Sequence, residues 1–379
     1  MKSRLIPIAI AFLKLGFTAF GGPAVAYAMM RQEFVTRRKW ISDETFFDYL
    51  GIANLVPGPN ATEMAILIGF NQSGWVGMVL AGICYILPAM AIVLSLAWVY
   101  VRFGSLPELE GILYGIKPVV VSVLISAIWG LLKPRRSNLW GMAVVVGVFG
   151  TYLVGVSPII LLLAGGALLG LITYIKGAGQ PPKMLLAWLP LSVGTLRDLA
   201  QTAAFDLGEL FWVFLKAGAF MYGSGYVLLA FIHEDLVVRL GWLSNSQLVD
   251  AIAVGQVTPG PLSTTATFVG YLLGGVPAAL LATLAMFLPS FLFVGVIYYA
   301  VKNLRASERF SGLLEGVNFA ALGLMAGVTW EIGGTALVDP LSIGIVTAAL
   351  FLLFSFNLGA PWLILGGAVV GLLRMMVLG

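Results

Sequence analysis

The chain contains the same segment twice, and this duplication is the strongest constraint on its fold. Residues Leu13–Pro59 and Leu215–Pro261 align at a constant offset of 202. One residue is then lost, and the alignment continues at an offset of 201, so that Gly115 corresponds to Gly316. We expect two equivalent halves, residues 1–176 and 207–379, joined by a linker at residues 177–206. In membrane proteins such halves commonly surround a transport path, and matched glycine or proline breaks indicate the binding site.

The composition places the chain in a lipid bilayer. Hydrophobic residues make up 60% of the sequence and charged residues 10%, with a mean hydropathy of +1.00. Soluble domains carry about 25% charged residues. The net charge of +4 comes from short basic clusters between apolar runs, which is typical of membrane orientation signals and not of nucleic-acid binding. The single cysteine, Cys84, excludes a disulfide within the chain, and the sequence predicts no metal site and no cofactor.

Six apolar segments can be identified in each half. They are Leu5–Met30, Phe46–Phe70, Trp75–Val101, Ile112–Leu132, Leu139–Val154 and Pro158–Ile175, followed by Leu207–Ile232, Leu248–Leu273, Val276–Val301, Leu313–Trp330, Leu341–Phe356 and Pro361–Leu378. A crossing helix needs about 20 apolar residues. The second segment of each half is interrupted by a Pro-Gly-Pro element, which is incompatible with a continuous helix and requires a buried or water-lined place.

The basic residues indicate how these segments cross. If both Pro-Gly-Pro segments enter the membrane and return, each half has five crossings and the halves are inverted. One side then carries 13 lysines and arginines and the other 5, with Lys2 and Arg4 on the poorer side. A full crossing would instead separate the two densest basic clusters. We therefore predict an all-α polytopic membrane protein of two inverted-topology repeats, with about 10 transmembrane helices and two re-entrant or broken segments.

Each half contains two helix breaks, and both resemble helix starts within the membrane. The first is Gly21-Gly22-Pro23 or Gly223-Ser224-Gly225, and the second is the Pro-Gly-Pro element. Helix N-termini present unpaired amides and a partial positive charge, and therefore favour an anion. The alternative is that the breaks are only kinks between packed helices. The predicted substrate-binding residues are Lys14, Gly21, Gly22, Pro23, Pro57, Gly58, Pro59, Asn60, Thr62, Lys216, Gly223, Ser224, Gly225, Pro259, Gly260, Pro261, Ser263, Thr264 and Thr265.

Charged residues within the apolar segments need a reason to be there, because a lysine at the bilayer centre costs about 2.5–3.5 kcal/mol. Lys14 and Lys216 occupy the same repeat position and could hold an anion or extend to the membrane surface. Lys117 is a second candidate for the anion path. Glu63 could carry a proton, or it could cap the helix that begins near Asn60.

The remaining candidate residues are two acids and a serine–histidine pair. Glu33 and Asp235 are expected to pair with neighbouring basic residues at the surface. Ser224 and His233 raise the alternative of an intramembrane hydrolase, but nine helical residues would separate them by about 13–14 Å. The sequence therefore does not predict an enzyme.

Phe17-Thr18-Ala19-Phe20-Gly21-Gly22-Pro23, both Pro-Gly-Pro elements and the duplicated layout together resemble the chromate transporter family in its long two-domain form. The resemblance covers nearly the whole chain, although Tyr222-Gly223-Ser224-Gly225 departs from the pattern and makes the half-sites unequal. The resemblance implies efflux of chromate, with sulfate as a second candidate substrate, across the bacterial inner membrane, and chromate resistance as the result.

Several alternatives stay open at this point. Another tetrahedral oxyanion, such as sulfate or molybdate, would satisfy the same amide donors. A passive anion channel would also fit the pattern. The membrane potential favours export of a dianion, because each charge gains about 2.3 kcal/mol per 100 mV, so proton coupling is optional. The sequence leaves the oligomeric state open, with a homodimer as one arrangement, and does not decide the orientation of the termini.

Overall fold

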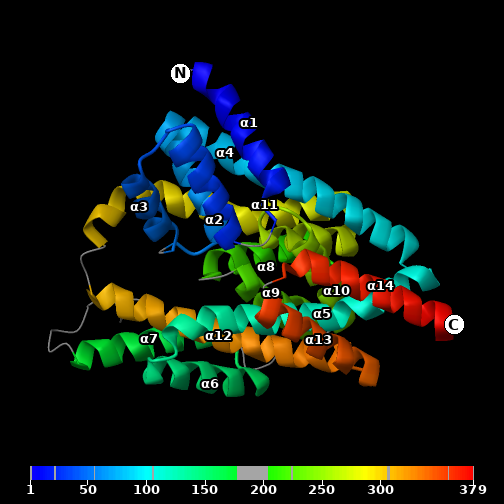
Figure 1. The fold of residues 1–379 in the computed structure, drawn as a ribbon. Coiled ribbons are helices and arrows are strands. Elements are labelled where there is room, and N and C mark those ends of the chain that lie inside the picture. Colours follow the sequence, from blue (N-terminus) through cyan, green and yellow to red (C-terminus); the bar gives the residue numbers. More distant parts are fainter. Residues whose placement is uncertain are drawn as a thin grey trace.

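The computed structural model describes the whole chain except residues 1, 21–22, 55, 105, 177–203, 223–224, 305–307, 357 and 379. The described part consists of helices and connecting turns, without a strand (Figure 1). This confirms the all-helical fold class. Most of the predicted linker at residues 177–206 lies outside the described residues.

The two halves contain the same order of helices. The first half has α1 (Lys2–Thr18), α2 (Pro23–Arg31), η1 (Gln32–Arg37), α3 (Asp43–Ala53), α4 (Asn60–Phe103), α5 (Pro107–Leu132), η2 (Lys133–Arg135), α6 (Leu139–Leu153) and α7 (Pro158–Lys176). The second half has α8 (Leu207–Phe220), η4 (Gly225–Val227), α9 (Leu228–Ile232), η5 (His233–Arg239), α10 (Asn245–Val257), η6 (Leu262–Thr264), α11 (Thr265–Leu304), α12 (Glu308–Ala336), α13 (Pro340–Phe356) and α14 (Ala360–Leu378).

Both predicted kinds of break are helix starts. The first apolar segment, Leu5–Met30, divides into α1 and α2, and α2 begins at Pro23. Helix α4 begins directly after Pro59, and η6 begins directly after Pro261. Proline suits these positions because the first amides of a helix have no partner within it.

Helices α4 and α11 each fold back on themselves as a helical hairpin. Ser73 and Gly74 leave the helical conformation in α4, with Gly74 at φ +58°, and Gly274 and Gly275 do so in α11. A methyl group on Gly69 would touch Ala81, although a straight helix would hold these residues about 18 Å apart. The arms of α4, residues 60–72 and 75–103, are therefore antiparallel.

The two halves interlock through equivalent pairs of helices. Helix α5 packs on α14 and α13, and its counterpart α12 packs on α7 and α6. Gly115 lies against the backbone of Gly367, and the equivalent Gly316 lies against Gly165. No larger residue fits at such contacts, because the backbones themselves touch. The core is thus shared by both halves, and α5 and α12 lie side by side within it (Figure 1).

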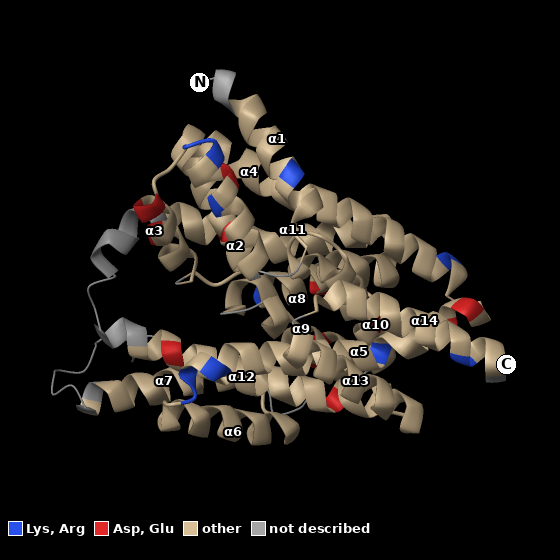
Figure 2. Ribbon diagram, in the orientation of Figure 1, with Lys and Arg blue, Asp and Glu red and all other residues tan. Residues whose placement is uncertain are grey.

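Several helices are long and apolar enough to cross a membrane. Among the described residues the segments with sufficient length and hydropathy are Asn60–Phe103, Pro107–Arg135, Leu262–Val296, Gly312–Ala336 and Ala360–Val377. Shorter apolar helices cover Leu5–Thr18, Leu139–Leu153, Pro158–Thr173 and Pro340–Phe356. Charged residues are sparse along the helices, which leaves long apolar stretches (Figure 2). The protein is therefore a multi-pass membrane protein, while the expected number of about 10 crossings stays a prediction.

Candidate functional site

Each Pro-Gly-Pro element is hydrogen-bonded to the first break of the other half. The amide of Gly58 donates to the carbonyl oxygen of Met221 at 2.7 Å, and the equivalent amide of Gly260 donates to that of Ala19 at 3.0 Å. Gly225, in the first break of the second half, lies beside Leu262 in the helix that follows Gly260. The breaks of both halves therefore meet in one region between the halves.

Polar side chains without a protein partner gather at the two helix starts in this region. Thr62 and Ser263 are fully buried, and neither hydroxyl group has a hydrogen-bond partner among the described residues. The same holds for single buried atoms of Asn60, Glu63 and Gln256. Buried polar groups are normally hydrogen-bonded, so a group of unpaired ones is typical of a binding site.

The remaining hydroxyl groups have a structural role. Thr264 donates to the carbonyl oxygen of Pro261 at 2.9 Å, and Thr265 donates to that of Leu262 at 2.8 Å. The glycine amides are also engaged, since they join the halves. The donors that can face an anion are therefore the hydroxyl groups of Thr62 and Ser263, together with the first amides of α4 and η6.

Glu63 lies at a contact between the two halves. Its carboxylate is fully buried and accepts a hydrogen bond of 2.8 Å from Ser290 of α11. Helix α4 is preceded by Pro59 and has no side-chain cap, so the interpretation of Glu63 as a capping residue is wrong. Tyr222, from the first break of the second half, is close enough to interact electrostatically with Glu63.

Lys14 and Lys216 each lie beside a cluster of charges. Lys216 pairs with the buried Asp235 at 2.5 Å, and Arg239 pairs with the same carboxylate at 3.0 Å. Lys14 is exposed and interacts electrostatically with Glu33. Both acids are paired with basic residues, as the sequence predicted, but the expectation that they lie at the surface is wrong, because Glu33 and Asp235 are buried.

In the first half, Glu33 is paired mainly with two arginines. Arg38 donates to Glu33 at 2.6 Å, and Arg37 donates to it at 3.1 Å. The hydrogen bond from Arg38 lowers the pKa of Glu33 below its usual value. Neither of these charge clusters includes a residue of a Pro-Gly-Pro element.

Lys117 joins α5 to the second half. Its ammonium group donates to Ser246 at 2.6 Å and lies 3.6 Å from the buried carboxylate of Asp250. Tyr100 of α4 donates to the other oxygen of Asp250 at 2.9 Å. The sequence singled out Lys117 but did not indicate this partner, because residues 133 positions apart in the chain share no local pattern.

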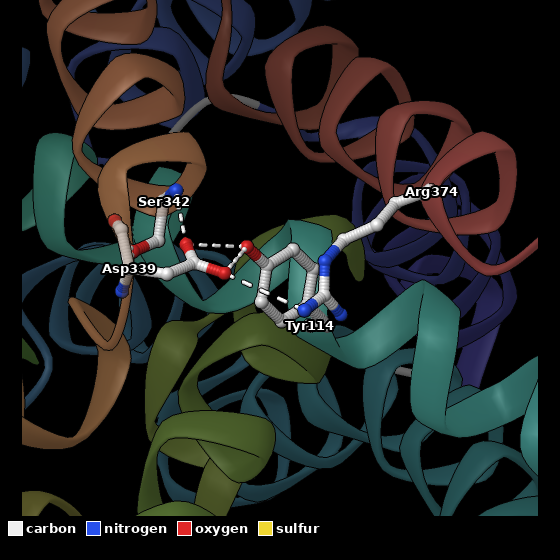
Figure 3. A network of polar contacts seen from close by, with 4 residues as sticks. All are labelled: Tyr114, Asp339, Ser342 and Arg374. Atoms are coloured by element: carbon white, nitrogen blue, oxygen red, sulfur yellow. Dashed lines mark hydrogen bonds and ion pairs between the residues drawn. The ribbon is translucent and has the colours of Figure 1, made fainter. Parts of the chain in front are cut away.

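A second network joins α5 to the start of α13 and to α14 (Figure 3). The Tyr114 hydroxyl lies 2.6 Å from both carboxylate oxygens of Asp339, and Arg374 lies over the Tyr114 ring, 3.9 Å from its centroid. The hydrogen bond from Tyr114 lowers the pKa of Asp339 below its usual value. The repeat places Glu315 and Asn138 at the positions of Tyr114 and Asp339, and they are also hydrogen-bonded, at 3.1 Å.

Four residues of the predicted site, Gly21, Gly22, Gly223 and Ser224, lie outside the described residues. The two remaining first-break residues, Pro23 and Gly225, begin α2 and η4. The structure thus gathers the Pro-Gly-Pro elements, Asn60, Thr62, Ser263 and Glu63 in one region. It holds Lys14, Lys216 and Lys117 in separate charged contacts.

Apolar helices of membrane-spanning length, and breaks that meet between two equivalent halves, define a polytopic membrane protein with a duplicated core. The chain matches the family model of the chromate transporters twice, over residues 6–171 and 208–372. It therefore belongs to the chromate transporter family, which is a family of transporters.

Relatives from several bacteria match nearly the whole chain. A chromate transport protein of Cupriavidus metallidurans is 33% identical over 95% of this chain and 91% of its own length. A probable chromate transport protein of Synechococcus elongatus is 30% identical over 96% of this chain and 93% of its own length. A chromate transport protein of Pseudomonas aeruginosa is 29% identical over 91% of this chain and 85% of its own length. No solved structure matches the chain.

Proposed function

We propose that the protein is a secondary transporter that exports chromate across the bacterial cytoplasmic membrane and thereby confers chromate resistance. Family membership supports chromate as the substrate. The observation that carries the site is the pair of reciprocal bonds from Gly58 and Gly260, next to the unpaired buried hydroxyl groups of Thr62 and Ser263. Two helix starts with hydroxyl donors suit a tetrahedral dianion, because amides and hydroxyl groups replace the water around its oxygens.

We propose further that residues 1–176 and 207–379 are inverted relative to one another, with residues 177–206 as the linker. Two hydrogen bonds support this. Asn138, which follows the end of α5, bonds Glu315 near the start of α12, and Asp339, which follows the end of α12, bonds Tyr114 near the start of α5. Because α5 and α12 also pack together, these equivalent helices run antiparallel. If they cross the bilayer, the axis that relates the halves lies in the membrane plane.

The membrane potential supplies a sufficient driving force for export. A dianion that leaves a cell with a negative interior gains about 4.6 kcal/mol per 100 mV, because each charge contributes about 2.3 kcal/mol. Glu63 is the candidate for additional proton coupling, since a buried carboxylate next to an anion is repelled unless it binds a proton.

Chromate uptake into everted membrane vesicles tests the proposed site. The variant Thr62→Val combined with Ser263→Ala should lower uptake at least about tenfold, because two hydrogen bonds to a charged ligand contribute about 1.5–3 kcal/mol each. Thr329→Val is the matched control, since Thr329 is buried but bonds a carbonyl oxygen of its own helix. Unchanged uptake by the double variant would remove these residues from the site.

The same assay compares substrates and tests the lysines. Sulfate or molybdate that competes with chromate at equal concentration would identify a general oxyanion carrier, and flux that does not saturate would identify a channel. Lys14→Gln and Lys216→Gln should each lower uptake if the lysines attract the anion. Full activity of both variants would exclude this role.

A further inference from the structure

His233 is the only histidine of the chain and lies in a buried polar cluster. It begins η5, and only 3% of its surface is exposed. Its Nδ1 atom is 2.9 Å from the hydroxyl group of Tyr152 in α6 and 3.1 Å from Oε2 of Glu331 in α12. Its Nε2 atom is 3.0 Å from the side-chain oxygen of Asn245 at the start of α10.

The hydrogen bonds of the His233 ring can accommodate one additional proton. With Nε2 donating to the Asn245 oxygen, Nδ1 of a neutral ring is an acceptor, and an ionised Glu331 carboxylate is an acceptor as well. The Tyr152 hydroxyl is 3.4 Å from the same carboxylate oxygen and can donate to only one of the two atoms at a time. A proton between Nδ1 and Oε2 gives both atoms a partner.

The other half of the repeat holds a different pair at the same position. Arg31 and Asp43 correspond to His233 and Asn245, and they form a salt bridge of 2.7 Å that is about half exposed. The counterparts of Tyr152 and Glu331 are Leu353 and Gly130, which cannot titrate. A surface ion pair in one half is therefore replaced by a buried titratable cluster in the other.

We propose that His233, Glu331 and Tyr152 form a binding site for a single proton. The site is separate from the Pro-Gly-Pro region and goes beyond the proposed function, because it binds its proton whatever the protein transports. It connects η5, which follows the first break of the second half, to α6 and α12. Binding of a proton strengthens this connection by turning two facing acceptors into a charged hydrogen bond.

The other charged groups nearby are engaged elsewhere or face Tyr152. Glu234 of η5 interacts electrostatically with Tyr152. Asp235 is held by Lys216 of α8 and by Arg239 of η5, and Arg239 also bonds Glu209 of α8 at 2.6 Å. On α12, Glu331 is the acid in direct contact with the ring, and its side chain is 31% exposed, so protons from outside can reach the cluster.

NMR spectroscopy of protein labelled only in histidine tests the site directly, because after removal of any affinity tag a single ring gives the signal. Burial lowers the pKa of the His233 ring below its ordinary value, and we expect a single titration step of this ring. Glu331→Gln should lower the midpoint by at least about one pH unit, because the carboxylate favours the charged ring. Tyr152→Phe should raise it, because the neutral ring then loses its donor while Glu331 is retained.

Glu315→Gln is the matched control, since Glu315 lies on the same helix and bonds Asn138, away from the histidine. This variant should leave the midpoint unchanged. A ring that keeps one protonation state from about pH 5 to pH 9 would overturn the proposal. So would a midpoint that Glu331→Gln and Tyr152→Phe shift no more than Glu315→Gln does.

Discussion

The amide of Gly58 donates a hydrogen bond of 2.7 Å to the carbonyl oxygen of Met221, across the contact between the two halves. Proline has no amide hydrogen, so the glycine provides the one backbone donor of the Pro-Gly-Pro element. The equivalent bond from Gly260 to Ala19 repeats the contact. Both elements thus hold the halves together at the same place where they begin a helix.

Gly58→Ala should impair both stability and transport. Gly58 has φ +142°, and a methyl group would overlap the carboxylate of Glu63 and the hydroxyl group of Ser290. We expect a loss of about 1–3 kcal/mol in stability and a decrease of at least about tenfold in chromate uptake. Gly147→Ala is the control, because a methyl group there meets no atom within 4 Å. If the Gly58→Ala variant kept the melting temperature and the chromate uptake of the unchanged protein, the contact of Gly58 with Glu63 and Ser290 would not be required.

Glu63→Gln should separate two driving forces. Glutamine retains the size of the buried side chain but cannot release a proton. If Glu63 couples proton movement to transport, uptake driven by the membrane potential persists in the variant, whereas stimulation by a pH gradient disappears. Flux into proteoliposomes with a clamped potential measures both. If a pH gradient stimulated uptake by the variant as much as uptake by the unchanged protein, proton coupling would have to involve a group other than Glu63.

Lys117 and Asp250 should behave as a coupled pair. Removal of one partner leaves a buried charge and lowers stability by about 1–3 kcal/mol, which is less than a fully buried pair loses because Lys117 is 21% exposed. The double variant Lys117→Met, Asp250→Asn should recover most of this loss. A double-mutant cycle of melting temperatures in detergent provides the measurement, and additive losses would mean that the two residues act independently.

Local features of the sequence predicted the positions of the helix breaks. Proline and glycine act on the backbone of their immediate neighbours, so α2, α4 and η6 begin where the sequence predicted. The duplication predicted two equivalent halves, and the hydrogen bonds donated by Gly58 and Gly260 are one contact that occurs in both. The turn within α4 lies between two of the predicted apolar segments.

Local sequence features did not predict the contacts between segments that are distant in the chain. The pairing of Lys117 with Asp250 depends on how the helices pack, and so does the hydrogen bond from Ser290 of α11 to Glu63. Within its own half, the sequence relates His233 only to Ser224, nine residues away. Comparison of His233 with Arg31 at an offset of 202 would have shown that the second half replaces a fixed charge with a titratable group.

Ser137 and Val338 provide the most direct test of the inverted arrangement of the two halves. They are repeat equivalents at an offset of 201, both are exposed, and each follows one of the antiparallel helices α5 and α12. Cysteines are introduced singly at these positions after replacement of the buried Cys84 by alanine. Intact cells are then treated with a maleimide that cannot cross the membrane. The inverted arrangement predicts that one of the two cysteines is labelled in intact cells and the other only after the membrane is opened; labelling of both from the same side would contradict it.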